Sequence, residues 1–285
     1  MTARILDGEA AAAAIRDELA TRITALADKG VTPGLGTILV GDDPPSRRYI
    51  AMKHEDASAL GLHTRELNLD ASASQQEIEV AIEVLNNDED IHAFIVQYPF
   101  PPGLHYGNAV LHMDPAKDAD GLHPVNLGLL VMGVEAPVAC TPAGIIRLLT
   151  HHGVEIPGRH VVIVGRGLTI GRPLANLLAL KRPDGNAAVT VVHTGVSDLG
   201  RFTREADILI AAAGSPGLIT ADMVKPGAAV VAAGVSFEGR KVVSDVDEGV
   251  AEVAGWLSPR IGGVGPMTRA LLMSNAVEAA ERSIA

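Results

Sequence analysis

The residue types with the clearest chemical use in this sequence are a tyrosine and a lysine, Tyr49 and Lys53, four positions apart. They fall in a stretch, 46–60, whose pattern predicts a helix, so both side chains share one helix face. A phenol and an amine placed together can stack on a flat heterocycle and move a proton. The lysine would act as acid and base near neutral pH only if its pKa fell from about 10.4 towards about 7–8. Taken alone, such a pair more often marks an ordinary helix surface.

Two further polar residues strengthen the case for a site. Gln97 ends a predicted strand, 91–97, and open α/β sheets place ligand-binding groups at such strand ends. Asp120 lies in a polar loop beside Gly121, where its carboxylate could accept paired N–H donors from a ring. The alternative for Asp120 is a turn aspartate, which is common before glycine.

A glycine-rich turn follows the apolar run 160–165 and precedes a predicted helix with Pro173 near its start. Gly165 would permit the tight turn, Gly167 would let the backbone approach a pyrophosphate, and Gly171 would let the helix lie close on the sheet. The helix N-terminus offers N–H groups to phosphates. The spacing is one residue longer than the common fingerprint, and an ordinary strand-to-helix turn is the alternative.

The second strand of this half ends at His193 and Thr194, without the carboxylate that usually holds the ribose of NAD. Arg166 could pair with a ribose phosphate instead, which favours NADP over NAD. Arg166 could also be a solvated loop cation, and His193 could simply end its strand. The residues expected to bind the dinucleotide are Gly165, Arg166, Gly167, Thr169, Ile170, Gly171, His193, Thr194, Ala213, Gly214 and Val235.

The elements that must position these groups alternate between strand and helix. In the first half, helices are expected at 9–29, 46–60 and from Ser74 with a capping box to Glu77, and strands at 35–41, 63–69 and 91–97. The loop 114–126 lacks periodicity. A helix should start with Thr141 as N-cap and Pro142 in its first turn, and end near 152. Four buried parallel strands follow at 160–165, 189–193, 206–214 and 228–234, and a last helix at 267–282.

This pattern predicts an α/β protein of two domains, with a joint near 153–158. Residues 1–140 would form an N-terminal catalytic domain, completed by a C-terminal helix, 268–285, that returns to it. Residues 141–267 would form a Rossmann-like domain with a doubly wound parallel sheet.

Composition excludes several classes of protein. A net charge of −11 over 285 residues argues against non-specific nucleic-acid binding, which needs clustered Lys and Arg. No stretch approaches the roughly 18 apolar residues of a membrane span, and the N-terminus predicts an amphipathic helix rather than a signal peptide. The one cysteine, Cys140, fits a reducing compartment and a small buried residue. We expect a cytoplasmic protein with no metal, since no cluster has ligand spacing.

Nine segments together resemble the bifunctional methylenetetrahydrofolate dehydrogenase/methenyltetrahydrofolate cyclohydrolase family. They are SRRYIAMK, VQYPFPPG, PAKDADGLHPVN, CTPAGI, GRGLTIGRP, VTVVHT, ADILIAAAG, VKPGAAVV and GGVGPMT. They span nearly the whole chain in the family's order. The resemblance implies NADP-dependent oxidation of methylenetetrahydrofolate, then hydrolysis to formyltetrahydrofolate, which serves purine biosynthesis. It also implies a homodimer.

The resemblance also assigns roles to residues. It implies that Lys53 is the catalytic lysine, tuned by Gln97, and that Asp120 binds the pterin ring. Tyr49 would stack on folate. Ser46, Gly262, Gly263 and Pro266 complete the expected substrate-binding set.

Departures from the family pattern exist. Gly167 replaces a frequent serine, and Gly195 follows Thr194 where a basic residue is frequent, which weakens the case for NADP. Two rival functions stay open on sequence. One is another two-domain NADP-dependent dehydrogenase of the shikimate or amino-acid type, and the other is a non-catalytic NADP-binding sensor.

Overall fold

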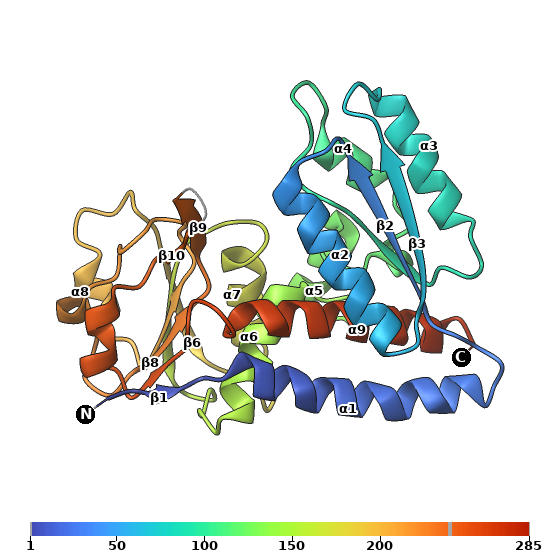
Figure 1. Cartoon of the computed structure of the whole chain (residues 1–285). Helices are drawn as coiled ribbons and strands as arrows, with labels where there is room; N and C mark the ends of the chain where they lie inside the picture. The colour runs from blue at the N-terminus through green and yellow to red at the C-terminus, as the bar shows by residue number, and fades with distance from the viewer. Residues whose placement is uncertain (1, 239–240, 285) are drawn as a thin grey trace. The chain divides into compact units, whose positions relative to one another are not determined.

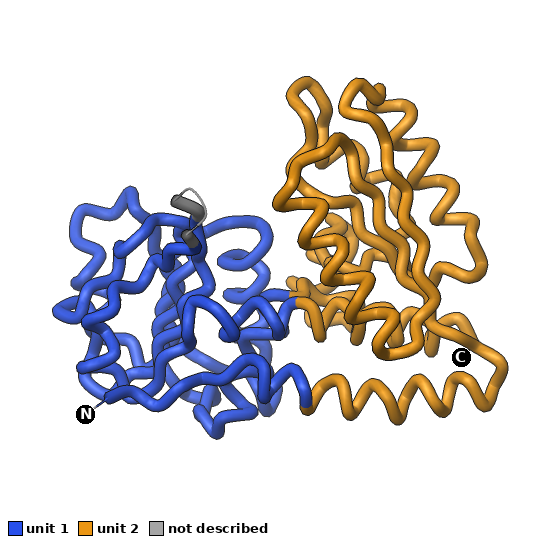
Figure 2. The backbone as a smooth tube through the Cα atoms, in the orientation of Figure 1, with its two compact units in different colours: residues 1–13, 141–268 blue, residues 14–140, 269–285 orange. Residues whose placement is uncertain are grey.

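The computed structural model describes residues 2–238 and 241–284. The chain divides into two compact units, coloured separately in Figure 2: residues 1–13 with 141–268, and residues 14–140 with 269–285. The first thirteen residues thus group with the second half of the chain, in contrast to the expected grouping. The reason is that strand β1 (Arg4–Ile5) pairs in parallel with β11 (Trp256–Leu257). The units divide after residue 140, not at 153–158.

The unit of residues 14–140 and 269–285 is built on a three-stranded parallel sheet. Its strands are β2 (Gly34–Val40), β3 (His63–Leu69) and β4 (Ala93–Val96), in the order β3-β2-β4. The central strand β2 is buried along its whole length, as expected for a parallel strand covered on both faces. All three strands confirm the predicted ones.

Helices surround this sheet (Figure 1). They are α2 (Pro44–Ala59), α3 (Gln75–Asn86), α4 (Tyr106–Leu111), α5 (Pro124–Met132) and a short 3-10 turn, η1 (Pro115–Lys117). The predicted capping box of α3 is confirmed: the Glu77 N–H donates to Ser74 Oγ at 3.2 Å, and the Ser74 N–H donates to Glu77 Oε2 at 2.7 Å. Ile78, Ile82 and Leu85 of α3 bury their side chains in the core of this unit.

The segment 114–126 is more regular than expected. It contains η1 and the start of α5, whose N-cap is His123: its Nδ1 accepts a hydrogen bond from the Val125 N–H at 3.1 Å. The prediction of an aperiodic loop was wrong here because capping side chains, not apolar periodicity, create these short elements. Helix α4 was likewise not predicted.

Two long helices contribute residues to both units: α1 (Gly8–Ala27) and α9 (Val264–Arg282). Within the unit of 14–140, Asn275 of α9 is buried and donates from Nδ2 to the carbonyls of Ala119 at 2.8 Å and Val138 at 3.0 Å. Arg22 of α1 forms an ion pair with Glu281. The expected return of the C-terminal helix to the first half is therefore confirmed.

The unit of residues 1–13 and 141–268 is built on a six-stranded parallel sheet in the order β1-β11-β8-β7-β5-β6. Besides β1 and β11, its strands are β5 (His160–Val164), β6 (Ala188–Val192), β7 (Ile208–Ala211) and β8 (Ala229–Ala232). A separate antiparallel pair, β9 (Val235–Glu238) and β10 (Lys241–Ser244), follows β8. The four predicted strands are present and parallel. The expectation that all four are buried was wrong for β6, because it is the edge strand of the sheet and only its Val192 is buried. The strands β1, β9, β10 and β11 were not predicted.

The remaining elements of this unit are α6 (Cys140–His151), α7 (Gly171–Ala179), α8 (Gly200–Thr203), η2 (Ala221–Met223) and η3 (Glu248–Glu252). Helix α6 begins at Cys140, so Thr141 is already helical and is not the N-cap. Its hydroxyl instead forms a hydrogen bond with the Thr268 hydroxyl at 3.0 Å.

The strand order places a topological switch point beside β5. The chain moves from β5 to β6 on one side and then crosses to β7 on the other. In doubly wound sheets, ligands bind at such a point, outside the carboxyl ends of the strands. The segments after β5 and β7 are therefore the ones to inspect for a dinucleotide site.

The buried amide of Asn275 should contribute measurably to stability. Asn275→Ala would remove a buried amide donor from the carbonyls of Val138 and Ala119, of which Ala119 keeps the weak thiol donor of Cys140, so we expect the free energy of unfolding to fall by about 1–3 kcal/mol. Urea unfolding followed by circular dichroism measures it. Asn87→Ala, which removes an exposed asparagine at the end of α3, should change stability by less than about 0.5 kcal/mol. Equal effects of the two substitutions would refute the role given to Asn275.

Candidate functional site

Helix α2 positions three of the predicted site residues. Its N-cap is Asp43, whose carboxylate accepts the Ser46 N–H at 3.0 Å and the Ser46 hydroxyl at 2.6 Å. Pro44 in the first turn has no N–H to satisfy. Ser46 is thus buried as part of the cap, and the cap fixes where the next turns of α2 present Tyr49 and Lys53.

The Lys53 amine lies in a nearly closed environment. The residue is only 4% exposed, and its Nζ donates to Oε1 of Gln97 at 3.3 Å. Nζ also lies 4.5 Å from the centroid of the Tyr49 ring. The Gln97 Nε2 donates to the Tyr98 carbonyl at 2.6 Å, which leaves Oε1 directed to the amine. The structure therefore brings Tyr49, Lys53 and Gln97 together.

Burial lowers the pKa of Lys53, because the charged amine loses its hydration. The charge of Asp120 acts in the opposite direction and raises the pKa, as does Cys140, but burial dominates. The oxygen of Gln97 is a neutral acceptor and does not replace a counter-ion. A lysine in this state can exist as the neutral amine nearer to neutral pH than an exposed lysine can.

The pKa of Tyr49 is shifted in the opposite direction from that of Lys53. Burial, followed by the charge of Asp120, raises its pKa to about 12. The phenol therefore keeps its proton at any physiological pH and offers a neutral ring and a hydroxyl donor. This suits stacking on a flat ligand rather than proton abstraction.

Asp120 sits beside these groups, and its neighbour Asp118 carries the hydrogen bonds of the turn. The Asp118 carboxylate accepts from the Gly121 N–H at 3.0 Å, the His123 N–H at 2.7 Å and Asn126 Nδ2 at 2.9 Å. Among the hydrogen bonds of residues 2–238 and 241–284, none ends on the Asp120 carboxylate. The turn function considered for Asp120 therefore belongs to Asp118, and Asp120 keeps its acceptors for a ligand.

Sequence reasoning missed an ion pair next to the site. Arg269 of α9 lies 3.2 Å from the carboxylate of Asp56, which is three residues beyond Lys53 on α2. Charges of both residues reach Tyr49. The three-residue spacing from Lys53 to Asp56 could have indicated that Asp56 lies near the site. The pairing with Arg269 of α9 could not be predicted, because the two residues are far apart in sequence.

The prediction that Cys140 is a small buried residue is confirmed. Cys140 is 3% exposed, and its thiol donates to the Ala119 carbonyl at 3.1 Å. Burial raises the pKa of the thiol well above its ordinary value, so the group is not a nucleophile.

In the other unit, the glycine-rich turn has the geometry that a phosphate cradle needs. Gly165 has φ +135°, and a Cβ there would lie 2.1 Å from the Ala212 carbonyl oxygen. A Cβ on Gly171, the first residue of α7, would lie 2.2 Å from the Gly165 oxygen. Gly167 is exposed, and a Cβ there would meet nothing within 4 Å. Gly165 and Gly171 are thus required by packing, whereas the space at Gly167 is open to a ligand.

The N-terminus of α7 adds to this cradle. Its N-cap is Ile170, which has no side-chain oxygen, so no side chain caps the helix at that position. Thr169 precedes it and is exposed. Of the first residues of α7, Arg172 donates its N–H to the Gly167 carbonyl at 3.1 Å and Pro173 has no N–H, so the sequence-based assignment of this helix start to phosphates is left with Gly171.

Arg166 and Thr194 follow neighbouring strands. Val164 of β5 is paired in register with Val192 of β6. Arg166 lies two positions after Val164, and Thr194 lies two positions after Val192. Both are exposed. His193 accepts the Gly195 N–H on Nδ1 at 3.1 Å and so shapes the turn. A guanidinium and a hydroxyl past the ends of adjacent parallel strands suit a ribose phosphate.

Ala213 and Gly214 follow β7, across the switch point from Gly165, and Gly214 has φ +64°. The Gly214 carbonyl accepts a hydrogen bond from Ser236 at 3.2 Å, and Val235, which precedes Ser236, is 46% exposed. Ala213, Gly214 and Val235, which were predicted to bind the dinucleotide, therefore lie in two segments of this unit that are hydrogen-bonded to each other.

The predicted residues Gly262, Gly263 and Pro266 also lie in this unit, where the φ of +78° explains the glycine at 262 and packing explains the glycine at 263. The Gly8 N–H donates to the Gly262 carbonyl at 2.8 Å, and a Cβ on Gly8 would lie 1.7 Å from the Gly263 oxygen. A Cβ on Gly263 would lie 2.3 Å from the Pro259 oxygen. Pro266 is the third residue of α9, which starts at Val264 rather than near 267. Their contact with folate stays a prediction.

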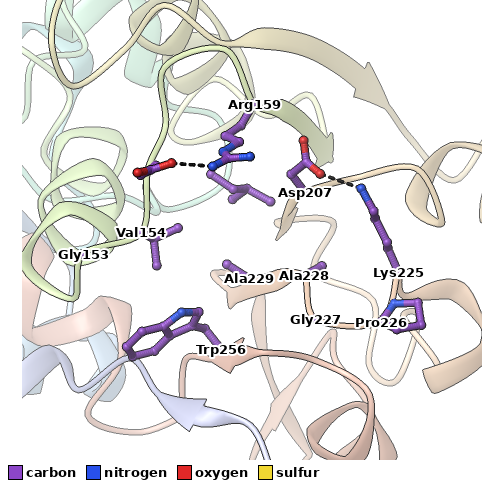
Figure 3. A pocket seen from close by; sticks show the side chains of 12 residues that line it. Gly153, Val154, Arg159, Asp207, Lys225, Pro226, Gly227, Ala228, Ala229 and Trp256 are labelled. Atoms are coloured by element: carbon purple, nitrogen blue, oxygen red, sulfur yellow. Dashed lines mark hydrogen bonds and ion pairs between the residues drawn. The ribbon is translucent and has the colours of Figure 1, made fainter.

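A pocket of about 340 Å³ lies at the amino ends of strands in the six-stranded sheet, whereas the glycine-rich turn follows the carboxyl end of β5 (Figure 3). Arg159 and Asp207, which line it, precede strands β5 and β7, whereas Gly165 follows β5. Its cations are paired: Lys225 with Asp207 at 2.6 Å and Arg159 with Glu155. This pocket is therefore not part of the candidate dinucleotide site.

Metal sites and membrane-spanning helices are both absent from the described ranges, 2–238 and 241–284. No group of three or more His, Cys, Asp or Glu side chains there could hold a metal ion. None of the helices there combines the length and apolar character needed to cross a membrane.

Comparison with known proteins agrees with the two-unit α/β fold. The family model described as tetrahydrofolate dehydrogenase/cyclohydrolase, catalytic domain, matches residues 6–120, and the model of the corresponding NAD(P)-binding domain matches residues 139–284. The bifunctional protein FolD of Syntrophotalea carbinolica is 53% identical over 99% of this chain and 97% of its own length.

Solved structures give the same result. The bifunctional enzyme FolD from Campylobacter jejuni has a TM-score of 0.93 at 37% identity, covering 98% of this chain and 99% of its own. The methylenetetrahydrofolate dehydrogenase-cyclohydrolase (FolD) of Trypanosoma brucei, complexed with NADP cofactor and inhibitor, has a TM-score of 0.92 at 37% identity and covers 100% and 99%.

The fold and the two sites define a two-unit α/β enzyme of the dinucleotide-binding class. Within that class, the chain belongs to the tetrahydrofolate dehydrogenase/cyclohydrolase family. The rival dehydrogenase of the shikimate or amino-acid type is not favoured, because the two family models together cover most of the chain.

The glycine turn allows a matched pair of substitutions. Gly165→Ala should lower the free energy of unfolding by about 2 kcal/mol or more, because its φ and the Ala212 carbonyl exclude a side chain. Gly167→Ala should change stability by less than about 0.5 kcal/mol yet weaken NADPH binding. Thermal unfolding and NADPH fluorescence titration measure the two effects. Normal NADPH binding by the Gly167 variant would exclude this residue from the phosphate site.

Proposed function

We propose that this chain oxidises 5,10-methylenetetrahydrofolate to 5,10-methenyltetrahydrofolate with NADP⁺ and then hydrolyses the product to 10-formyltetrahydrofolate. The observation that carries the proposal is the buried Lys53 amine, held between Gln97 and the Tyr49 ring in a member of this enzyme family. We assign the folate chemistry to the unit of residues 14–140 and 269–285, and the dinucleotide to the unit of 141–268.

In the hydrolytic step, Lys53 acts on a cationic substrate. Methenyltetrahydrofolate carries a positive charge, which disfavours a second cation beside it and adds to the effect of burial on the lysine. The neutral amine can accept a proton from the water that attacks the methenyl carbon. The bond between that carbon and N5 then breaks, N5 takes the proton back from the lysine, and the hydroxyl proton leaves to solvent, which completes the formyl group. Gln97 holds the amine in place, and the carboxylate of Asp120 is free to accept N–H donors of the pterin ring. Tyr49 offers its ring for stacking.

The dinucleotide is assigned to the turn from Gly165 to Gly171. The absence of a Cβ at Gly165 and Gly171 creates the close strand-to-helix approach that a pyrophosphate site uses. When bound, NADP⁺ supplies the hydride acceptor for the oxidation. We favour NADP over NAD because Arg166 and Thr194 follow adjacent strands, because the second strand ends in His193 and Thr194 without a carboxylate, and because one solved relative is complexed with NADP.

The residues we propose for the two sites keep the assignments made from sequence. Substrate contacts are Ser46, Tyr49, Lys53, Gln97, Asp120, Gly262, Gly263 and Pro266, and Ser46 acts through the cap of α2. We further propose a cytoplasmic homodimer whose product serves purine biosynthesis. Light scattering of the purified protein tests the dimer.

A substitution of the lysine tests the hydrolytic assignment. Lys53→Met should lower cyclohydrolase turnover by about 10²–10⁴-fold, since the proton acceptor is lost while the buried alkyl chain is kept. The decay of methenyltetrahydrofolate absorbance measures it. Lys29→Met removes an exposed lysine beyond the end of α1 and should leave turnover unchanged. Undiminished hydrolysis by the Lys53 variant would show that another group moves the proton.

Cofactor choice is tested at Arg166. Arg166→Ala should raise KM for NADP⁺ about tenfold or more, since a charge-assisted bond to the ribose phosphate is lost, and should change KM for NAD⁺ by less than about twofold. Steady-state kinetics with both cofactors measure the difference. Arg201→Ala, at an exposed arginine of α8, should affect neither. A parallel rise in both KM values would show that Arg166 does not read the phosphate.

A further inference from the structure

Asp245 is a fully buried carboxylate that the proposed reaction does not use. It directly follows β10 and is 0% exposed. None of the ion pairs found within residues 2–238 and 241–284 involves it. A buried carboxylate must be stabilised by hydrogen bonds if it lacks a cation.

Those hydrogen bonds come from three consecutive backbone N–H groups. Asp245 Oδ2 accepts from Ala213 at 2.7 Å and Gly214 at 2.9 Å, and Oδ1 accepts from Ser215 at 2.7 Å. Successive N–H groups that converge in this way form an anion-binding concavity. The left-handed φ of Gly214 creates the concave shape. The side chain of Asp245 therefore occupies an anion site made by the chain itself.

The surroundings are shaped for this carboxylate. A Cβ on Gly234 would lie 1.8 Å from Asp245 Oδ2, so only glycine leaves room for it. The Asp245 N–H donates to the Gly234 carbonyl at 3.2 Å. From the other side, the Ser236 hydroxyl donates to the Gly214 carbonyl at 3.2 Å. The loop 213–215 is thus held at both its N–H and its carbonyl groups.

This loop adjoins the glycine turn. It begins one residue after Ala212, whose N–H donates to the Val164 carbonyl at 2.8 Å and whose oxygen would contact any Cβ on Gly165. The two segments lie at the carboxyl ends of β7 and β5, on either side of the switch point. Whatever fixes the loop 213–215 therefore also fixes one wall of the dinucleotide site.

We propose that Asp245 is a positioning residue for the dinucleotide. Its carboxylate fills the anion site of the loop 213–215, which sets the backbone of that wall and denies the site to a ligand phosphate. The pyrophosphate is then left with the N–H groups of the Gly165 turn. This inference rests on the proposed dinucleotide site, because it assigns Asp245 a role towards it.

The test is Asp245→Asn in the full-length protein. The amide places an N–H₂ donor against backbone donors, so at least one hydrogen bond is lost and the loop must move. We expect the Kd for NADPH to rise about tenfold or more. Cyclohydrolase kcat/KM, which depends on Lys53 in the other unit, should change less than about twofold. Asp247→Asn is the matched control, since its carboxylate is exposed and accepts a single hydrogen bond from the described part of the chain, that of the Gly249 N–H at 2.8 Å.

Either of two results for Asp245→Asn would overturn the proposal. One is an unchanged Kd for NADPH. The other is an equal loss of NADPH affinity and cyclohydrolase activity, which would indicate general damage to the fold. If the Asp245 variant does not fold, Ser236→Ala loosens the same loop by one hydrogen bond and should raise the Kd about threefold with hydrolysis intact. No rise in this variant also overturns it. Failure of the wild-type protein to bind NADPH would instead refute the proposed function.

Discussion

The amine of Lys53, buried without a carboxylate in hydrogen-bond contact, is the constraint on which the folate site depends. Water that would stabilise the charged form is excluded, and a single neutral oxygen, Gln97 Oε1, takes its place. Asp120 moderates the effect through its charge without removing it. The site therefore holds a base that can be neutral beside a substrate that carries the positive charge.

The fold supports this amine from several directions. The cap at Asp43 starts α2, so that Tyr49 and Lys53 face the same way, and the end of β4 delivers Gln97. Asp118 takes over the hydrogen bonds of its turn and leaves Asp120 free. In the other unit, backbone N–H groups at the end of β7 bind the carboxylate of Asp245, and we propose that those of the turn after β5 bind the phosphates of the dinucleotide.

Much of this arrangement could be predicted from sequence. Apolar runs between turn residues gave the buried strands, and Ser74 with Glu77 gave the start of α3. The strands β1 and β11 could not be predicted, because two residues carry no periodicity and only pairing defines them. The start of α5 depends on a histidine cap, which is an uncommon signal.

Within the sites, prediction worked where chemistry and local spacing coincide. Tyr49, Lys53 and Gln97 lie together as expected because strand ends and helix faces are local features. The pairing of Arg269 with Asp56 and the contacts of Asp245 join segments far apart in sequence, so no local pattern indicates them. For Gly262 and Gly263 local structure already explains the residue type, since Gly262 has φ +78° and the Pro259 carbonyl leaves no room for a Cβ on Gly263.

The ionisation of Lys53 can be measured by NMR titration of protein labelled at the lysine ε-carbon, with Lys53→Met used to assign the signal. The structure requires a pKa below that of the exposed lysines in the same spectrum, and a further decrease in Asp120→Asn, because the charge of Asp120 raises the pKa of the amine. A Lys53 signal that titrates together with the exposed lysines would contradict the account of the site as a buried, neutralisable base.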